Sequence, residues 1–170
     1  MSTRHATVST SELGELTLVA SGPKLVGIYF PGHWTLPDPA SFGEPVDAAA
    51  DPVLAEAAAQ LRQYLGGERT AFELDTATDG SAFEEQVWSL LRELPFGETT
   101  TYGELAERLG DRTLARRVGQ AVGRNPLSIV VGCHRVLGKD GALRGYAGGL
   151  GRKRFLLELE RPTLLGPSAA

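Results

Sequence analysis

The chain has 170 residues, of which 42% are hydrophobic and 22% charged, and its formal net charge is −4. This composition is ordinary for a globular protein of one or two small domains, and it excludes collagen-like, coiled-coil and largely disordered chains. No apolar run approaches the ~20 residues that span a bilayer, and the first residues lack the apolar core of a secretory signal. A single cysteine, Cys133, excludes an intrachain disulfide and a cysteine-rich zinc site. We therefore expect a cytoplasmic protein with no membrane contact.

The first part of the chain is predicted to form a small α/β domain. Two apolar, β-prone runs separated by Ser-Gly-Pro predict a hairpin, and apolar residues at helical spacing before a Gly-Gly pair predict a helix. In chain order we expect a hairpin, a long proline-rich surface loop, a helix and a further strand: residues 14–30, 31–51, 52–65 and 70–75. Because no chemical motif falls in this part, residues 1–78 are interpreted as a supporting domain.

The second part of the chain is predicted to be mainly helical. Two capping boxes, each a Ser or Thr with a Glu three residues later, mark helix starts, and Thr113 is a further candidate cap. Together with a final apolar run, these signals predict four helices: residues 82–94, 102–109, 114–123 and 152–160. The middle two, joined by a short turn that contains glycine, are typical of a helix-turn-helix, although ordinary helical hairpins show the same pattern.

An apolar, β-prone run at residues 128–131 predicts a strand that leads into the cysteine. The expected fold class is therefore α+β, with the small α/β domain followed by a mainly helical domain with a helix-turn-helix over residues 79–162. The last residues, 163–170, are expected to form a disordered tail.

Charge is distributed unevenly along the chain. Residues 1–110 hold 6 basic and 17 acidic residues, whereas residues 111–154 hold 10 basic and only 2 acidic ones. A concentrated basic stretch in an acidic chain indicates local contact with a polyanion such as DNA, and the alternative is a solvated arginine-rich surface. The third predicted helix carries arginines that can neutralise phosphates and small residues that allow close approach: Arg116, Arg117, Gly119 and Ala121.

Cys133 is followed directly by His134 and Arg135. A lone cysteine is most often a small buried hydrophobic residue, but adjacent cationic groups favour the thiolate, which is the reactive form. Neighbouring residues of a strand point to opposite faces, so His134 needs a sharp turn or a bridging water to reach the sulfur. Glu160, on the last predicted helix, is a candidate to orient the imidazole. Two other functions remain open: a non-enzymatic DNA binder and a Cys-His hydrolase.

The order of motifs in the second part resembles the O6-alkylguanine-DNA alkyltransferase family. These motifs are FEEQVW at 83–88, PFGETTTYGELA at 95–106, RRVGQA at 116–121, Asn125-Pro126, GCHRV at 132–136, GYAGG at 145–149 and LLELE at 156–160. The resemblance is continuous from Phe83 to Glu160 and weaker over the first part, where it implies a ribonuclease-H-like domain. Gly132 departs from the pattern, because the family usually has proline before the cysteine, and proline would stiffen the turn.

The resemblance implies a single-turnover DNA repair protein. Such a protein flips O6-alkylguanine, and also O4-alkylthymine, out of double-stranded DNA from the minor groove and transfers the alkyl group irreversibly to Cys133. Some members of the family have a zinc site, but the three histidines of this chain are scattered and do not supply its ligands, so we expect no metal. We also expect no cofactor and a monomeric protein. Relatives that only sense lesions lack the reactive cysteine, which argues against the non-enzymatic binder.

The resemblance also implies roles for individual residues. His134 is the water-mediated base of Cys133 and is held by Glu160, while Tyr102 rotates the nucleotide and stabilises the departing base. Arg116 fills the space that the extruded base leaves, and Asn125 is the hinge between the recognition helix and the active-site segment. The base pocket is formed by Val136, Tyr146 and Ala147.

Overall fold

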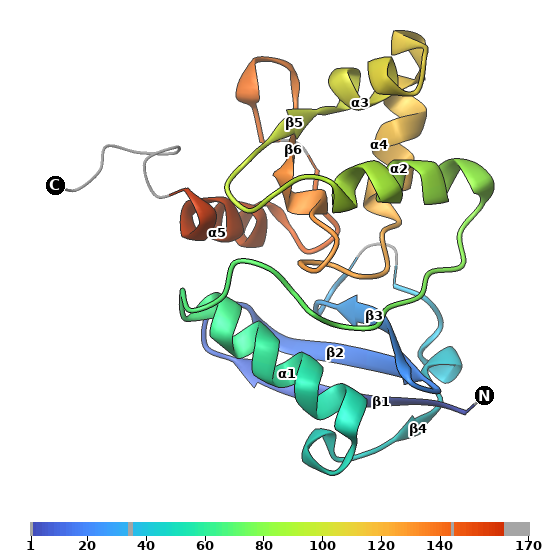
Figure 1. Cartoon of the computed structure of the whole chain (residues 1–170), viewed down its shortest axis with the longest axis vertical. Coiled ribbons are helices and arrows are strands. Elements are labelled where there is room, and N and C mark those ends of the chain that lie inside the picture. The colour runs from blue at the N-terminus through green and yellow to red at the C-terminus, as the bar shows by residue number, and fades with distance from the viewer. Residues whose placement is uncertain (1, 34–35, 144, 162–170) are drawn as a thin grey trace, which may run out of the picture. The chain divides into compact units, whose positions relative to one another are not determined.

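The computed structural model describes residues 2–33, 36–143 and 145–161 of the chain (Figure 1). The tail that was expected to be disordered, 163–170, lies outside these residues. In the described part, no helix is both long enough and apolar enough to cross a lipid bilayer.

The chain divides into two compact units, and the first, Met1–Thr78, is a four-stranded sheet with one helix packed on it (Figure 1). The strands lie in the order β3-β2-β1-β4, and all neighbours are antiparallel except β1 and β4, which are parallel. The bounds are β1 Thr3–Thr10, β2 Gly14–Ser21, β3 Lys24–Tyr29, β4 Glu44–Pro45 and α1 Pro52–Leu65. The predicted hairpin (β2 and β3) and the predicted helix (α1) are both confirmed.

Helix α1 begins and ends at residues whose chemistry favours those positions. The Asp51 carboxylate accepts hydrogen bonds from the backbone amides of Val53 and Leu54, and Pro52 occupies the first helical position, where no amide donor is needed. The helix ends at Gly66. Its buried residues recur at helical spacing and cover one face of the sheet: Leu54, Ala57, Ala58, Leu61 and Leu65.

Three predictions for the first unit were incomplete or wrong. Strand β1 was not predicted, because only Ala6 and Val8 along it are buried and the remaining residues do not form an apolar run. The predicted loop over 31–51 contains β4 and two short 3-10 turns, Pro39–Phe42 and Ala48–Ala50.

The strand predicted over 70–75 is absent; a single bridge between Leu25 and Thr76 takes its place. The side-chain amide of Gln60 accepts from the Glu73 amide at 2.9 Å and donates to the Glu73 carbonyl at 3.1 Å. Because this one side chain from α1 pairs with both backbone groups of Glu73, the segment needs no strand partner at that position.

The second unit, Asp79–Ala170, is mainly helical with a two-stranded parallel sheet, so the α+β class is confirmed. The bounds are α2 Ala82–Arg92, β5 Thr100–Thr101, α3 Tyr102–Arg108, α4 Ala115–Gly123, β6 Val136–Leu137 and α5 Leu150–Glu160. The first predicted capping box is present in full, since the Ser81 side chain accepts from the Glu84 amide and the Glu84 carboxylate accepts from the Ser81 amide. Thr101 caps α3 in the same way through its hydroxyl.

Thr113 was wrongly predicted as the cap of α4. The Asp111 carboxylate accepts from both the backbone amide and the hydroxyl of Thr113, at 2.9 and 2.6 Å, and begins a 3-10 turn, Arg112–Leu114. The Thr113 hydroxyl is therefore already used, and α4 begins after this turn without a side-chain cap. The connection between α3 and α4 is correspondingly longer than the short turn predicted from the sequence.

The strand predicted over 128–131 is also wrong. These residues form a tight loop in which Ile129 has a positive φ of 75° and Ser128 bridges Val131. The Asn125 side chain closes the loop: its amide donates to the Val131 carbonyl and its oxygen accepts from the Leu127 amide, both at 2.9 Å. An amide side chain has thus replaced the neighbouring strand that an extended segment would need.

Candidate active site and nucleic-acid interface

Cys133 begins a 3-10 turn, Cys133–Arg135, instead of lying in a strand. The tightness of this turn allows two successive side chains, His134 and Arg135, to reach the same carboxylate, that of Glu160. A sharp turn, one of the two alternatives that the sequence left open for His134, is therefore present. It directs the imidazole toward α5, where the sequence-based candidate Glu160 lies.

The Cys133 thiol is buried, with 5% of the residue exposed, among polar side chains. Burial raises the pKa of the thiol, while the neighbouring side chains of Asn125 and Tyr146 and the nearby Lys153 ammonium oppose that rise. This differs from the expectation that the adjacent histidine and arginine favour the thiolate, because their side chains are bound to Glu160. Ionisation of the sulfur therefore requires a base and charge stabilisation at the time of reaction.

Glu160 accepts hydrogen bonds at both carboxylate oxygens. Oε2 lies 2.8 Å from His134 Nε2 and 2.9 Å from Arg135 Nη2, while Oε1 lies 2.8 Å from Arg135 Nε and 3.3 Å from the Gly97 amide. Arg135 also donates from Nη1 to the carbonyl of Leu94 at 2.7 Å. The guanidinium therefore joins the active-site turn to the end of α5 and to the segment that follows α2.

The charges of this group follow from its contacts. Burial alone would raise the pKa of Glu160, but hydrogen bonds from His134 and Arg135 hold it well below its usual range. Burial lowers the pKa of His134, although Glu160 opposes this effect. At neutral pH Glu160 is thus an anion, which can only accept a hydrogen bond, so Nε2 of His134 carries a proton. Because the pKa of His134 is lowered, the ring is neutral and this is its one nitrogen-bound proton. Nδ1 is then an acceptor, and no group among the described residues hydrogen-bonds to it.

Lys153 is a functional candidate that the sequence reasoning missed. Its side chain is fully buried, and its Nζ lies 6.0 Å from the centre of the Tyr102 ring. Burial lowers its pKa to about 8, and the charge of Cys133 opposes that change. In the sequence Lys153 stands between Arg152 and Arg154 and resembles any other cation of the basic stretch, so only burial distinguishes it.

Tyr102 lies between this buried lysine and a surface groove of about 930 Å³. The groove is lined by Tyr102 and Gly103 of α3, by Arg116 and Gly119 of α4, and by the turn after β6, Gly138–Asp140. Helix α4 approaches the tyrosine closely, since a methyl group at Gly119 would lie 3.6 Å from the Tyr102 ring. The groove therefore combines an aromatic hydroxyl, a cationic side chain and a close helix backbone, although Cys133 itself does not line it.

Two other α4 residues that were predicted to contact DNA, Arg117 and Ala121, differ in their exposure. Arg117 is exposed, and its guanidinium carbon lies 4.0 Å from the centre of the Phe83 ring. Ala121 is buried, and its carbonyl accepts from the Trp88 indole nitrogen at 2.8 Å. Its prediction as a surface contact is therefore corrected, because Ala121 belongs to the same apolar stripe as Val118.

The predicted base-pocket residues lie in β6 and in the segment that connects β6 to α5. Val136 is fully buried at the start of β6, where it pairs with Thr100. Tyr146 is also buried, whereas Ala147 is half-buried. Of these three residues, Tyr146 is the one whose side chain lowers the pKa of the Cys133 thiol.

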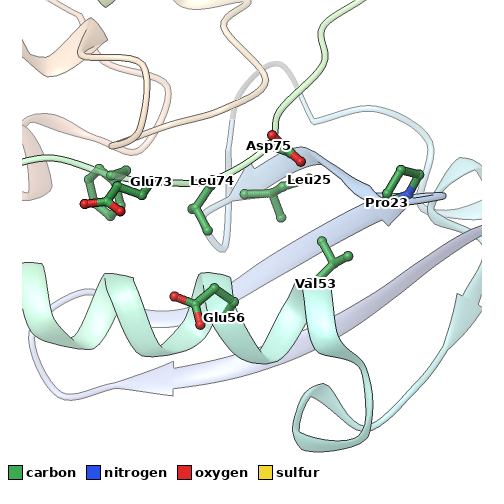
Figure 2. Close-up of a pocket in the computed structure, with 8 residues that line it drawn as sticks. Pro23, Leu25, Val53, Glu56, Glu73, Leu74 and Asp75 are labelled. Atoms are coloured by element: carbon green, nitrogen blue, oxygen red, sulfur yellow. The ribbon is translucent and has the colours of Figure 1, made fainter.

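A separate cavity of about 550 Å³ lies in the first unit (Figure 2). Figure 2 shows Val53 and Glu56 on α1, with Leu25 of β3 and the passing segment 73–75 around the same space. Three of its lining residues are acidic: Glu56, Glu73 and Asp75. These carboxylates disfavour a phosphate backbone, and the lining holds neither a cysteine nor a histidine, so the candidate chemistry lies in the second unit.

Two family models match the chain, one over each unit. The model described as "6-O-methylguanine DNA methyltransferase, ribonuclease-like domain" matches residues 5–78, and "6-O-methylguanine DNA methyltransferase, DNA binding domain" matches residues 82–162. The ribonuclease-like architecture expected for the first part is thus supported by the family match.

Individual relatives give the same result. The "Methylated-DNA--protein-cysteine methyltransferase" of Mycobacterium tuberculosis strain H37Rv is 42% identical over 165 residues, covering 92% of each chain. The protein of the same name from Methanosarcina acetivorans is 50% identical over 105 residues, covering 62% of this chain and 67% of the relative. Among solved structures, M. tuberculosis OGT in complex with DNA superposes with a TM-score of 0.83 at 38% identity, covering 94% of this chain and 93% of that one.

Proposed function

Because the chain belongs to the 6-O-methylguanine DNA methyltransferase family, we propose that it repairs alkylated DNA by transferring the alkyl group from O6-alkylguanine to Cys133. The enzyme is a methylated-DNA–protein-cysteine methyltransferase. The observation that carries the assignment of the acceptor is the position of the chain's one cysteine, next to a histidine that a buried carboxylate orients. Displacement at a saturated carbon requires a strong, soft nucleophile, which a thiolate provides.

His134 is the proposed base for Cys133. Its Nε2 is committed to Glu160, so the lone pair of Nδ1 is available to accept a proton. A water molecule that accepts from the thiol and donates to Nδ1 would carry the proton between them. The imidazolium so formed is stabilised by the Glu160 anion, in the same way that a buried carboxylate supports a catalytic histidine elsewhere.

Transfer then forms one bond and breaks one. The Cys133 sulfur attacks the alkyl carbon, the bond between that carbon and O6 breaks, and its electron pair stays with the guanine. The Tyr102 hydroxyl is the proposed proton donor to the leaving guanine, and the buried Lys153 ammonium stabilises the tyrosinate that remains. The product is a thioether, and because the chain has no second cysteine to attack it, each molecule reacts once.

The DNA is proposed to bind across α3 and α4, which would act as a helix-turn-helix presented to the minor groove. The target oxygen is not accessible in stacked DNA, so the alkylated base must rotate out of the duplex at a cost of a few kcal/mol. Arg116 is exposed at the groove and is the proposed side chain that fills the space left behind. Gly119 allows close approach, and Arg117 neutralises a phosphate.

Asn125 is proposed to connect DNA binding with the active site. Its side chain lowers the pKa of the Cys133 thiol and closes the loop that leads from α4 to the active-site turn. The second unit would thus supply both DNA binding and alkyl transfer, and the first unit would support it. O4-alkylthymine, whose alkylated oxygen presents the same leaving-group chemistry, is a proposed second substrate, and the protein is proposed to act as a monomer.

The stoichiometry of repair tests this function. Increasing amounts of a duplex containing O6-methylguanine are incubated with a fixed amount of protein, and the repaired guanine is counted. We expect a plateau at one repaired base per protein molecule and no repair by Cys133→Ser. Binding of the duplex without repair would instead support a lesion sensor, and repeated turnover on an ester would support a Cys-His hydrolase.

A further inference from the structure

Arg135 occupies more of the Glu160 carboxylate than His134 does. It donates to both oxygens from Nε and Nη2, whereas the imidazole donates to one. We propose that Arg135 is a positioning residue that acts through Glu160 to hold His134 in the tautomer that leaves Nδ1 as an acceptor, and that in this chain glycine at position 132 leaves room for the observed position of the arginine. The inference rests on the proposed function, since it concerns the base of that reaction.

Arg135 excludes a second hydrogen-bonding state of His134 and Glu160. If the buried Glu160 carboxyl carried a proton, it could donate to Nε2, and the imidazole proton would move to Nδ1. Nδ1 would then be a donor and could not accept the proton of Cys133. Burial favours that protonated state of Glu160, and the hydrogen bonds from Arg135 and His134 oppose it. The guanidinium stays protonated and donates to both oxygens of the carboxylate. It therefore favours the anionic form of Glu160 at every pH at which the protein works.

Arg135 is a permanently charged partner of the Glu160 carboxylate. The Gly97 amide, which also donates to this carboxylate at 3.3 Å, is neutral. Hydrogen bonds and charge from Arg135 and His134 both lower the pKa of Glu160. Because the guanidinium stays protonated while the imidazole is neutral, Arg135 supplies a lasting positive charge at this carboxyl group.

At Gly132 the lack of space beside Arg135, and not the backbone conformation, disfavours a larger residue. Its φ is −74°, which any residue adopts, so no conformational strain requires glycine. A Cβ at this position would lie 2.9 Å from Arg135 Cδ, 3.0 Å from Nη1 and 3.2 Å from Nε. Those atoms are held by Leu94 and Glu160, so the side chain cannot move aside without losing a hydrogen bond. In this arrangement a Cβ at position 132 would therefore press on the arginine that orients Glu160.

The tautomer of His134 can be measured directly in the intact protein without DNA. Long-range ¹H–¹⁵N spectra of histidine-labelled protein distinguish the two neutral tautomers, and the three histidines of the chain are separated by comparison with His134→Gln. We expect the Nε2–H tautomer in the wild type. In Arg135→Met, which keeps most of the side-chain volume but not the charge, a substantial population should have the proton on Nδ1. Arg135→Lys, which keeps the charge but not the bidentate geometry, should restore part of the wild-type Nε2–H signal.

The rate of methyl transfer is the functional measurement. It is followed in a single turnover with protein saturating over an O6-methylguanine duplex, so that duplex affinity does not enter. Because a positioned base contributes about 10²-fold or more, we expect Arg135→Met to slow transfer by roughly tenfold to a hundredfold and Arg135→Lys by less. A merely space-filling role predicts that Arg135→Met reacts at the wild-type rate.

A double-mutant cycle tests the part that concerns Gly132. Gly132→Ala should slow transfer several-fold and shift the His134 tautomer, whereas the matched change Gly151→Ala, where a Cβ meets nothing within 4 Å, should alter neither. If the glycine acts through Arg135, adding Gly132→Ala to Arg135→Met should cause no further loss. Independent losses that multiply would contradict the role of Gly132.

Failure of the proposed function and failure of the inference about Arg135 give different results. A wild-type protein that never becomes methylated overturns the proposed function. A wild-type protein that is methylated, with Arg135→Met retaining both its rate and the Nε2–H tautomer, overturns the inference alone. If Arg135→Met does not fold, as judged by loss of a cooperative thermal transition, Arg135→Lys and Gly132→Ala decide the inference by the same two measurements.

Discussion

The Nζ of Lys153 lies 6.0 Å from the centre of the Tyr102 ring, with the lysine side chain fully buried. A buried ammonium is costly, so its retention next to the proposed proton donor and close to Cys133 calls for a functional explanation. In the proposed mechanism it stabilises the two negative charges that develop during transfer, first on the sulfur and then on the tyrosine oxygen.

Replacing Lys153 by methionine should therefore slow chemistry more than it weakens DNA binding. The change keeps an unbranched side chain and removes the charge, so we expect the single-turnover rate on an O6-methylguanine duplex to fall about tenfold or more. Duplex affinity, measured by fluorescence anisotropy with Cys133→Ser in both proteins, should stay within about twofold. An unchanged rate would show that Lys153 has no electrostatic role.

Lys153 should also leave a signature in the pH dependence of stability. In the folded protein its proton is lost as the pH rises through about 8, whereas the unfolded lysine keeps its proton to about 10.5. Between pH 8 and 9 the unfolded chain binds more protons at this residue, so the contribution of Lys153 to the free energy of unfolding rises with pH, by at most about 1.4 kcal/mol per unit. Well below pH 8 Lys153 is protonated in both the folded and the unfolded state, so it no longer contributes to the change of the free energy of unfolding with pH.

Urea unfolding of the wild type and Lys153→Met at pH 7, 8 and 9 measures this effect. The wild type should gain stability relative to the variant between pH 8 and 9, with little relative change between pH 7 and 8. Parallel curves over the whole range would mean that the lysine titrates at its ordinary value.

The Trp88 indole connects α2 to the end of α4. Its Nε1 donates to the Ala121 carbonyl at 2.8 Å, and both residues are buried. Trp88→Phe leaves that carbonyl without this donor and removes ring volume, so it should lower the free energy of unfolding by about 1–3 kcal/mol. Chemical denaturation measures the loss. A loss below about 0.5 kcal/mol would contradict this role.

Capping signals predicted the starts of α2 and α3 well because their physics is local. Ser81 and Thr101 each cap the amide of a glutamate three residues later, so no distant contact is needed to begin α2 or α3. The same locality explains the confirmed hairpin of β2 and β3, whose strands are joined by a short turn.

The two wrongly predicted strands share a physical cause that composition does not reveal. In each, an amide side chain occupies the backbone groups that a neighbouring strand would have used: Gln60 for the segment near Glu73, and Asn125 for the loop that ends at Val131. Whether a particular Gln or Asn points to the backbone depends on the tertiary fold, so an apolar, β-prone run alone overpredicts strands.

Adjacency in the sequence was also a poor guide to the state of the sulfur. His134 and Arg135 follow Cys133 directly, but both are bound to Glu160, and the side chains around the thiol come from Asn125 and Tyr146. The His134–Glu160 contact could be anticipated from the motif order. The bidentate arginine and the buried Lys153 could not, because burial is a property of the folded chain.

Arg116 should matter for duplex DNA and not for a free base. If its side chain fills the space of an extruded nucleotide, Arg116→Ala should slow repair of duplex O6-methylguanine by about tenfold or more while leaving the reaction with the free alkylated base unchanged. Parallel assays with the two substrates separate extrusion from chemistry. Equal losses on both would remove the proposed role, and Arg69→Ala, on the first unit, is the matched control.

The mass of the Cys133 peptide tests the central claim most directly. After incubation with an O6-methylguanine duplex, the intact protein should gain about 14 Da, the difference between a thiol and a methyl thioether, and the gain should map to the peptide that contains Cys133. Cys133→Ser should gain nothing under the same conditions. A methylated duplex that is repaired while the Cys133 peptide keeps its original mass would contradict the account.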